Sequence, residues 1–265
     1  MPLRQWIKDR LLRRGMIVSR PPGQFNIGDL KLRQLRHRGL KLNCAVDGGA
    51  AYGNWAREFK QVYPAATVLC VEPRDDTQPA LKSLARELPG IHLAKTLIGN
   101  RDGTVEFLEG GDVSSMFQNE GAGSVTRRVQ LPIARLDTLL AQQQLPPPDL
   151  IKLDLQGAEL SALQGAPSAL ERAQAVQVEL SFHRFFEGGP LFGDLVAFLR
   201  DQHFHCYDIF GLWHRPLDGA LAQGDFFFLR EGHPLWADRR WNNRGTWEFD
   251  GVGGLTRQVI EAMRD

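Results

Sequence analysis

The stretch VDGGAAYGNW, Val46 to Trp55, decides the fold of this chain. Its first residue, Val46, is the last of an apolar run that begins at Leu42, and such a run is typical of a buried strand. Beyond it, Trp55, Phe59 and Val62 recur at the i, i+4, i+7 spacing of an amphipathic helix. A strand, a glycine-rich turn and a helix in this order predict the first unit of a doubly wound α/β sheet.

Strands and helices alternate outward from this stretch. The pattern predicts strands over 44–47, 67–73, 91–99, 104–108, 125–133, 149–154, 175–180, 206–213 and 225–230. It predicts helices over 30–40, 55–62, 81–88, 136–140, 158–166 and 191–200. The helix-length connections favour a mostly parallel doubly wound sheet, and the last two strands are close enough in sequence to form a terminal antiparallel pair.

Charge and composition divide the chain into three parts. Residues 1–41 carry a net charge of +9 and the remainder −8, so we expect a basic N-terminal helical extension over 1–43. Such an arm suits nucleic acid, anionic lipid or an acidic partner, but nucleic acid is not expected because no basic groove with interleaved aromatic residues accompanies the arm. The main domain covers 44–230. An extension over 231–265, with Trp236, Trp241 and Trp247, is expected to pack on it.

The composition points to a cytoplasmic protein. No apolar run approaches the roughly 20 residues that a membrane span needs, and the N-terminus lacks the apolar core of a secretory signal. The three cysteines, Cys44, Cys70 and Cys206, sit in apolar surroundings, and their number is odd. We therefore expect buried free thiols in a reducing compartment.

The residues at the end of the first strand predict a nucleoside-containing cofactor. In an open α/β sheet the ligand sits above the carboxyl ends of the strands. Gly48, Gly49 and Gly53 would let the backbone approach it, because glycine has no Cβ. The helix that begins near Asn54 would offer unpaired N–H groups. Glu72, at the end of the next strand, would accept both hydroxyls of a ribose.

Two cofactors remain open from the spacing alone. The turn reads G-x-A-x-x-G, close to the dinucleotide fingerprint, which keeps an NAD(P)-linked oxidoreductase as an alternative. Asp47, immediately before the glycines, would repel a pyrophosphate but suits the amino group and sulfonium of S-adenosylmethionine. The terminal antiparallel strand pair is also typical of methyltransferases.

Several motifs resemble those of the FkbM-type methyltransferases. These are VDGGAAYGNW, CVEP (70–73), NRDGTVEF (100–107), SSM (114–116), LIKLDLQGAELSALQGA (150–166), VQVELSFHRFFEGGPLFGDLVAFL (176–199) and QGDFFFLR (223–230). The resemblance covers about 44–230 and implies a Rossmann-like class I methyltransferase fold that binds S-adenosylmethionine. The family's usual reaction is O-methylation of a hydroxyl in a sugar, glycan or secondary metabolite. Gln156 is a departure, since many members have glutamate there.

On this reading the cofactor contacts follow the strand ends. The methionine end is assigned to the residues of the glycine turn, the ribose to the following strand, the adenine to the third strand, and a further contact to a loop serine. The residues at the methionine end are Asp47, Gly48, Gly49, Gly53 and Asn54. The ribose contact is Glu72, the adenine contacts are Ile98 and Gly99, the loop serine is Ser115, and Asp154 lies at the cofactor edge.

The catalytic candidates lie on the later strands. His183 is the candidate general base, because an imidazole titrates near neutrality. Asp154 could position the acceptor or, with Glu179, bind a divalent metal, and Lys152 could instead pair with a carboxylate. The acceptor is expected to contact 110–124, 183–190 and the tail after 230. A homodimer and a non-catalytic protein that retains the cofactor fold both stay open.

Overall fold

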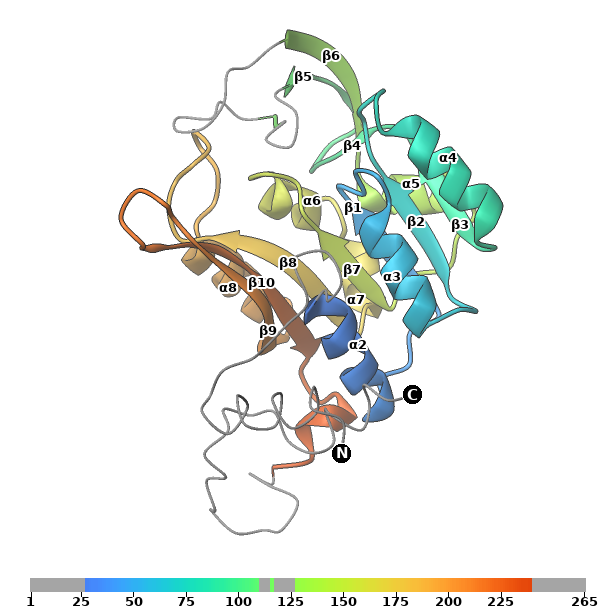
Figure 1. Cartoon of the computed structure of the whole chain (residues 1–265), viewed down its shortest axis with the longest axis vertical. Coiled ribbons are helices and arrows are strands. Elements are labelled where there is room, and N and C mark those ends of the chain that lie inside the picture. The colour runs from blue at the N-terminus through green and yellow to red at the C-terminus, as the bar shows by residue number, and fades with distance from the viewer. Residues whose placement is uncertain (1–26, 110–114, 117–126, 240–265) are drawn as a thin grey trace, which may run out of the picture. The chain divides into compact units, whose positions relative to one another are not determined.

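The computed structural model describes residues 27–109, 115–116 and 127–239 (Figure 1). The chain divides into two compact units, one of residues 41–233 and one of residues 1–40 with 234–265. The second unit contributes helix α2 (Ile27–His37) and the short 3₁₀ helix η2 (Pro234–Trp236). Trp241, Trp247 and most of 110–124 lie outside the described residues.

The unit 41–233 is built on a seven-stranded sheet of order β3-β2-β1-β7-β8-β10-β9. Its strands are β1 (Cys44–Gly48), β2 (Thr67–Val71), β3 (Ile91–Ala94), β7 (Leu150–Leu153), β8 (Ala175–Ser181), β9 (Phe204–His214) and β10 (Leu221–Arg230). The first five strands in this order pair parallel, and β10 is antiparallel to both β8 and β9. The predicted mostly parallel sheet with a terminal antiparallel pair is confirmed.

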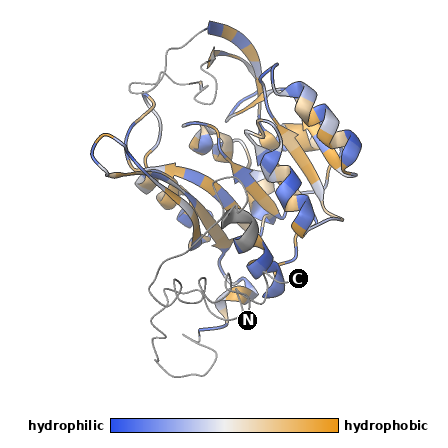
Figure 2. Cartoon of the chain, viewed as in Figure 1, coloured by the Kyte–Doolittle hydropathy of each residue, from blue (hydrophilic) through white to orange (hydrophobic). Residues whose placement is uncertain are grey.

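Helices cover both faces of this sheet, with α3 on the near side and α7 and α8 on the far side in Figure 1. The helices are α3 (Asn54–Val62), α4 (Gln78–Glu87), α5 (Leu136–Gln142), α6 (Glu159–Gln164), α7 (Pro167–Arg172) and α8 (Phe192–Asp201). The largest buried cluster joins alternate strand residues, such as Val46, Ile151 and Val178, to α5–α8. Figure 2 shows the hydrophobic strands between helices whose outer surfaces are hydrophilic.

A second, three-stranded sheet corrects one predicted element. Its order is β4 (Leu97–Ile98), β6 (Arg127–Ala134), β5 (Gly103–Glu109). The single strand predicted over 91–99 is wrong, because β3 pairs with β2 while β4 pairs parallel with β6. Between them the Thr96 hydroxyl donates to the Pro132 carbonyl at 2.9 Å, which ties the turn to the second sheet. In this sheet β5 pairs antiparallel with β6.

Two further predictions are corrected. The helix predicted over 158–166 ends at Gln164, and Pro167 starts the separate helix α7, as proline is well suited to a first helical turn. Cys44 and Cys70 are buried free thiols as predicted, but Cys206 is exposed because β9 is an edge strand with a single neighbour.

Among the described helices, none is long and apolar enough to cross a membrane.

Candidate functional site

The sheet order changes direction between β1 and β7, and the glycine turn lies at the carboxyl end of this switch point. Gly49 has φ +72°, and a Cβ built on it would lie 1.9 Å from the Asp154 carbonyl oxygen. A Cβ on Gly48 would meet Leu153 Cδ2 at 2.8 Å. Both glycines therefore permit the close approach of β1 to the chain that leaves β7.

Gly53 and Asn54 serve the start of α3. Gly53 has φ +81°, and a Cβ on it would meet Leu84 Cδ2 of α4 at 2.6 Å. Asn54 is the exposed first residue of the helix. Gly53 is thus required where two helices approach each other, which is a packing role that the sequence alone did not indicate.

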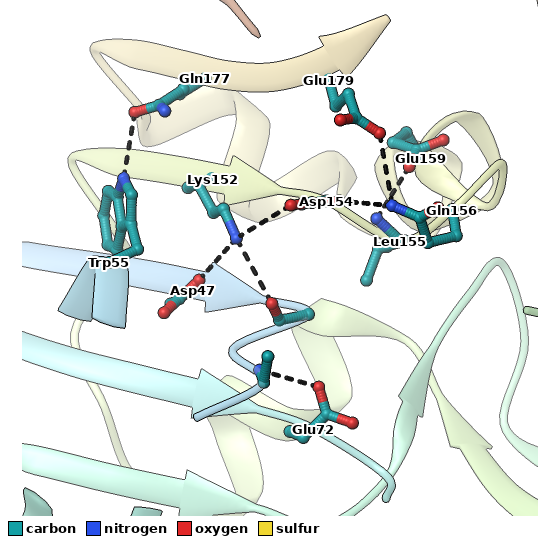
Figure 3. A network of polar contacts seen from close by, with 12 residues as sticks. Asp47, Trp55, Glu72, Lys152, Asp154, Leu155, Gln156, Glu159, Gln177 and Glu179 are labelled. Carbon is teal, nitrogen blue, oxygen red and sulfur yellow. Dashed lines mark hydrogen bonds and ion pairs between the residues drawn. The ribbon is translucent and has the colours of Figure 1, made fainter. Parts of the chain in front are cut away.

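Glu72 follows β2 and is 5% exposed. Its Oε2 accepts the Ala51 N–H at 2.9 Å (Figure 3). Its Oε1 accepts the Arg74 N–H at 3.1 Å. Burial raises the pKa of this carboxyl above its ordinary value, although the two N–H donors oppose the rise. The carboxylate is held rigidly, and each oxygen keeps a lone pair for a further donor.

A cavity of about 270 Å³ opens over these strand ends. Its polar wall includes Glu72, Asp154 and Gln156, and its apolar wall includes Ile98 and Phe107. The remaining lining residues are Gly49, Ala51, Val71, Pro73, Arg74, Thr96, Leu97, Met116, Leu155 and Ala158. Of the predicted cofactor contacts, Gly49, Glu72, Ile98 and Asp154 thus meet at one cavity.

A buried ion pair lies below this cavity (Figure 3). Lys152 Nζ is 3.0 Å from Asp47 Oδ1 and 4.0 Å from Asp154 Oδ2. Asp47 is 0% exposed, and burial raises its pKa while the Lys152 charge opposes the rise. Burial alone would lower the pKa of Lys152, but the charges of Asp47 and Asp154 raise it. Asp47 thus pairs with the lysine, in the way the sequence allowed for Lys152.

The ion pair continues into a polar row beneath α3. Lys152 is the register partner of both Asp47 and Gln177 in the parallel sheet. Trp55 Nε1 donates to Gln177 Oε1 at 3.3 Å, which connects α3 to this row. Neither Gln177 nor this use of Trp55 was predicted, because Gln177 sits inside an otherwise apolar run.

The turn after β7 is held by buried side chains. Gln156 has φ +52°, and its carbonyl accepts the Ser115 hydroxyl at 2.6 Å. Glu159 Oε1 accepts the N–H groups of Leu155 at 2.8 Å and Gly157 at 3.2 Å. Ser115 thus orders the loop beside the cavity, and burial raises the pKa of Glu159 to about 7.

A group of carboxylates lies beyond Asp154. Gln156 Nε2 donates to Asp154 Oδ1 at 3.0 Å and to Glu179 Oε2 at 3.4 Å. Burial, with the charges of neighbouring carboxylates, raises the pKa of Glu179 to about 9 and that of Asp225 to about 6. An amide therefore joins the two carboxylates that were candidate metal ligands. In the described part of the chain no group of three or more potential ligands gathers.

His183 and Gly99 lie elsewhere. His183 lines a separate small cavity with Glu159, Phe185 and Phe186, and its ring contacts Phe185 at 5.9 Å between centroids. A Cβ on Gly99 would meet Ile133 Cδ1 at 2.4 Å, so this glycine packs β4 against β6. The structure does not bring His183 to the 270 Å³ cavity formed by the described residues.

Comparisons with known proteins identify the family of this chain. The family model described as "Methyltransferase FkbM domain" matches residues 47–206, more than half of the chain. The 2-O-methyltransferase NoeI of Sinorhizobium fredii is 26% identical over 158 residues, which cover 54% of this chain and 65% of that relative, slightly less than two thirds of its length.

Solved structures align more distantly. A methyltransferase FkbM from Methylobacillus flagellatus KT is 18% identical, with a TM-score of 0.46 over 72% of this chain and 46% of that chain. The N-methyltransferase NodS from Bradyrhizobium japonicum WM9 is 7% identical, with a TM-score of 0.43 over 76% of this chain and 93% of that chain.

Proposed function

The chain belongs to the FkbM methyltransferase family and uses S-adenosylmethionine as its methyl donor, and on that premise we propose that it methylates a hydroxyl group of a sugar, a glycan or another small molecule. The observation that carries the proposal is the rigid Glu72 carboxylate beside the Gly49 turn, in a cavity at the switch point of the sheet.

The cavity residues fit the parts of this cofactor. Glu72 accepts the two ribose hydroxyls, because a buried carboxylate with free lone pairs needs such donors. Ile98 and Phe107 provide an apolar surface for the adenine. The backbone at Gly49 passes the methionine end without a Cβ between them. Asp154 supplies the negative charge that a sulfonium and an amino group require.

Asp154 is the proposed catalytic residue. When bound, S-adenosylmethionine supplies an electrophilic methyl group on its sulfur. Asp154 lines the cavity, and its orientation is fixed by Gln156 Nε2 at 3.0 Å and by the ammonium of Lys152 at 4.0 Å. Its carboxylate would orient the acceptor hydroxyl toward the methyl group and take up the hydroxyl proton, as the methyl–sulfur bond breaks and the methyl–oxygen bond forms. Lys152 and Asp47 are positioning residues.

Two arguments support oxygen as the atom that accepts the methyl group: the proton acceptor in the site and the name of a similar protein. A hydroxyl must lose its proton during transfer, and Asp154 offers the acceptor for that proton, while Glu179 and Asp225 offer hydrogen-bonding partners for neighbouring hydroxyls. The relative from Sinorhizobium fredii is named a 2-O-methyltransferase, which supports transfer to oxygen. A cytoplasmic location and the absence of a nucleic-acid partner stay predictions.

Titration calorimetry of the purified protein with S-adenosylhomocysteine and, separately, with NADH tests the cofactor. We expect S-adenosylhomocysteine to bind and NADH not to bind. Tight binding of NADH alone would overturn the proposal and restore the oxidoreductase alternative.

A second experiment tests catalysis. The protein is incubated with methyl-labelled S-adenosylmethionine and a panel of sugars, glycans and phenols, and label transfer is measured for the wild type, Asp154→Asn and His183→Ala. We expect Asp154→Asn to lose at least about 100-fold in kcat, the usual size of a general-base contribution, and His183→Ala to stay near wild type. Transfer at the full rate by Asp154→Asn would remove the assigned base. A wild type that binds the cofactor but methylates nothing would favour the non-catalytic alternative.

A further inference from the structure

A row of polar side chains runs across the sheet from the cavity toward its antiparallel edge. Glu179 of β8 lies opposite Asp225 of β10. Asp154 follows β7, the other neighbour of β8, and shares Gln156 Nε2 with Glu179. Residues opposite one another in a sheet point to the same face, so the three carboxylates lie on the face that also carries Lys152.

An exposed indole ends this row on β9. Asp225 lies opposite Gly211 and Gln223 lies opposite Trp213, so Trp213 is on the face of the carboxylates. A Cβ built on Gly211 would come within 2.8 Å of Trp213 Cη2, which means that the ring lies over Gly211, beside Asp225. The side chain is still 46% exposed. The missing side chain at Gly211 thus lets a large ring rest against the strand with an open surface.

The combination of an open indole and a row of hydrogen-bonding groups matches a sugar. A sugar ring has an apolar face of C–H groups, which an indole can cover, and hydroxyls at its edge. Carboxylates and amides accept from and donate to such hydroxyls. Gln223 Nε2 already donates to Glu179 Oε1 at 2.5 Å, which fixes the carboxyl in place. A flat aromatic acceptor would leave the polar row unused, and an acyclic polyol would leave the indole unused.

The spacing of the strands sets the size of the ligand. From Gly211 on β9 to Asp154 beyond β7 there are three strand spacings, β9–β10, β10–β8 and β8–β7. At about 4.8 Å each, they separate the backbone at Gly211, over which the indole lies, from the backbone at Asp154 by about 14 Å. That is longer than a single sugar ring, so one ring cannot contact both Trp213 and Asp154.

We propose that the acceptor is an oligosaccharide or glycoconjugate with at least two sugar rings, and that Trp213 stacks on a ring next to the one methylated at Asp154. The inference rests on the proposed function, since it places the acceptor relative to the methyl donor. Trp213 is then a specificity-determining residue, and Gly211, Asp225 and Glu179 shape the path between the two ends of the site.

Kinetics on matched acceptors test the proposal. The probes are methyl glycosides of glucose, galactose, mannose, fucose and N-acetylglucosamine, and di- to tetrasaccharides of the same sugars. For the longer acceptors we expect Trp213→Ala to raise KM about ten-fold, the effect of losing one stacking contact of about 1.4 kcal/mol. Their kcat, the KM of any monosaccharide substrate and the Kd of S-adenosylhomocysteine should stay within about two-fold, since only remote binding is lost.

Three further variants distinguish the loss of ring stacking from a nonspecific disturbance of the β9–β10 hairpin. Trp213→Phe keeps an aromatic face and should recover most of the affinity. The Gly211→Ala variant retains Trp213, but the added methyl group displaces the indole from the strand. This variant should therefore reproduce part of the Trp213→Ala effect. Leu217→Ala, on the same hairpin and 82% exposed, should behave as wild type.

The outcomes separate this inference from the function it rests on. If the protein methylates oligosaccharides and Trp213→Ala leaves their KM unchanged, the inference is wrong and the proposed function stands. The inference is equally overturned if only aromatic or acyclic hydroxyls are methylated, or if Trp213→Ala instead converts a dimer to a monomer in light scattering with KM unchanged. If no hydroxyl of any kind is methylated, the proposed function fails and the inference falls with it.

Discussion

Lys152 and Asp47, register partners on neighbouring parallel strands, form an ion pair of 3.0 Å in which both side chains are buried. Neither Asp47 oxygen makes a hydrogen bond of good geometry within the described residues, so the ammonium is the group that compensates this carboxylate. The pair lies directly below the cavity, and Lys152 extends from it toward Asp154 and the Gly49 carbonyl, 3.4 Å from its Nζ. Folding and the orientation of the Asp154 carboxylate are therefore linked through one lysine.

Removal of one partner of this pair should destabilise the protein strongly. Lys152→Met leaves Asp47 buried without its counter-charge, which typically costs about 3–5 kcal/mol. The double variant Asp47→Asn/Lys152→Met removes both charges and should recover at least half of that loss. Urea unfolding measures both free energies. The exposed pair Arg128–Glu106 is the control, and Arg128→Met should cost below about 1 kcal/mol. A similar small cost at Lys152 would contradict the role given to the buried pair.

Replacement of Glu72 should weaken cofactor binding. In Glu72→Gln the amide group presents donors where the carboxylate accepted the Ala51 or Arg74 N–H and where it is proposed to accept ribose hydroxyls. We expect the Kd of S-adenosylhomocysteine to rise about 10- to 100-fold, or about 1.4–2.7 kcal/mol, as measured by titration calorimetry. Glu87→Gln, an exposed substitution in α4, should leave the Kd unchanged. Equal affinities in both variants would remove Glu72 from the cofactor site.

Alanine substitutions at two glycines separate the cost of a steric clash in the glycine turn from the cost of backbone strain. Gly49→Ala places a methyl group 1.9 Å from the Asp154 carbonyl oxygen and also strains a residue at φ +72°. Gly219→Ala is matched in conformation, at φ +74°, but meets nothing within 4 Å. We expect the control to cost about 1 kcal/mol and Gly49→Ala to cost about 3 kcal/mol or more, with loss of S-adenosylhomocysteine binding. Thermal unfolding with and without ligand gives both quantities, and equal costs would show that contact with Asp154 is unimportant.

The half-buried carboxyl of Glu179 should make the stability of the protein depend on pH. Its folded-state pKa of about 9 is above the ordinary value of 4.5, so the folded protein holds this proton more tightly than the unfolded chain. The resulting stabilisation is complete below about pH 4.5 and is lost as the pH rises through about 9. Glu179→Gln mimics the protonated form and should reduce the loss of stability between pH 5 and 9 by up to about 5 kcal/mol, since one proton contributes about 1.4 kcal/mol per pH unit between the two pKa values.

Urea unfolding of Glu179→Gln at several pH values measures this effect. Glu171→Gln, at an exposed position of α7, serves as the matched control and should follow the wild-type profile. If Glu179→Gln also follows the wild-type profile, Glu179 is ionised in the folded protein and solvated more fully than its burial indicates.

Gly49 and Glu72 could be proposed as cofactor contacts from the sequence, because the signal for each depends on neighbours in the chain. A glycine at φ +72° and a carboxylate at the next strand end are constraints of local backbone geometry, and they identify Gly49 and Glu72 before any packing is known. Ser115 and Gly53 were predicted as cofactor contacts. In the structure the Ser115 hydroxyl donates to the Gln156 carbonyl, and Gly53 packs against Leu84. The residue types indicated that these positions are constrained, but they did not indicate which residues lie against them.

The sequence by itself determined the alternation of strands and helices, the glycine turn and the carboxylate after β2, since each follows from periodicity or backbone sterics within a few residues. Only the tertiary structure decided that Asp47 is buried against Lys152, that His183 lies away from the cavity, and that Asp225 and Trp213 share a face with Glu179. These relationships depend on strand order and register, which bring together residues distant in the chain, and no local pattern encodes which strands become neighbours.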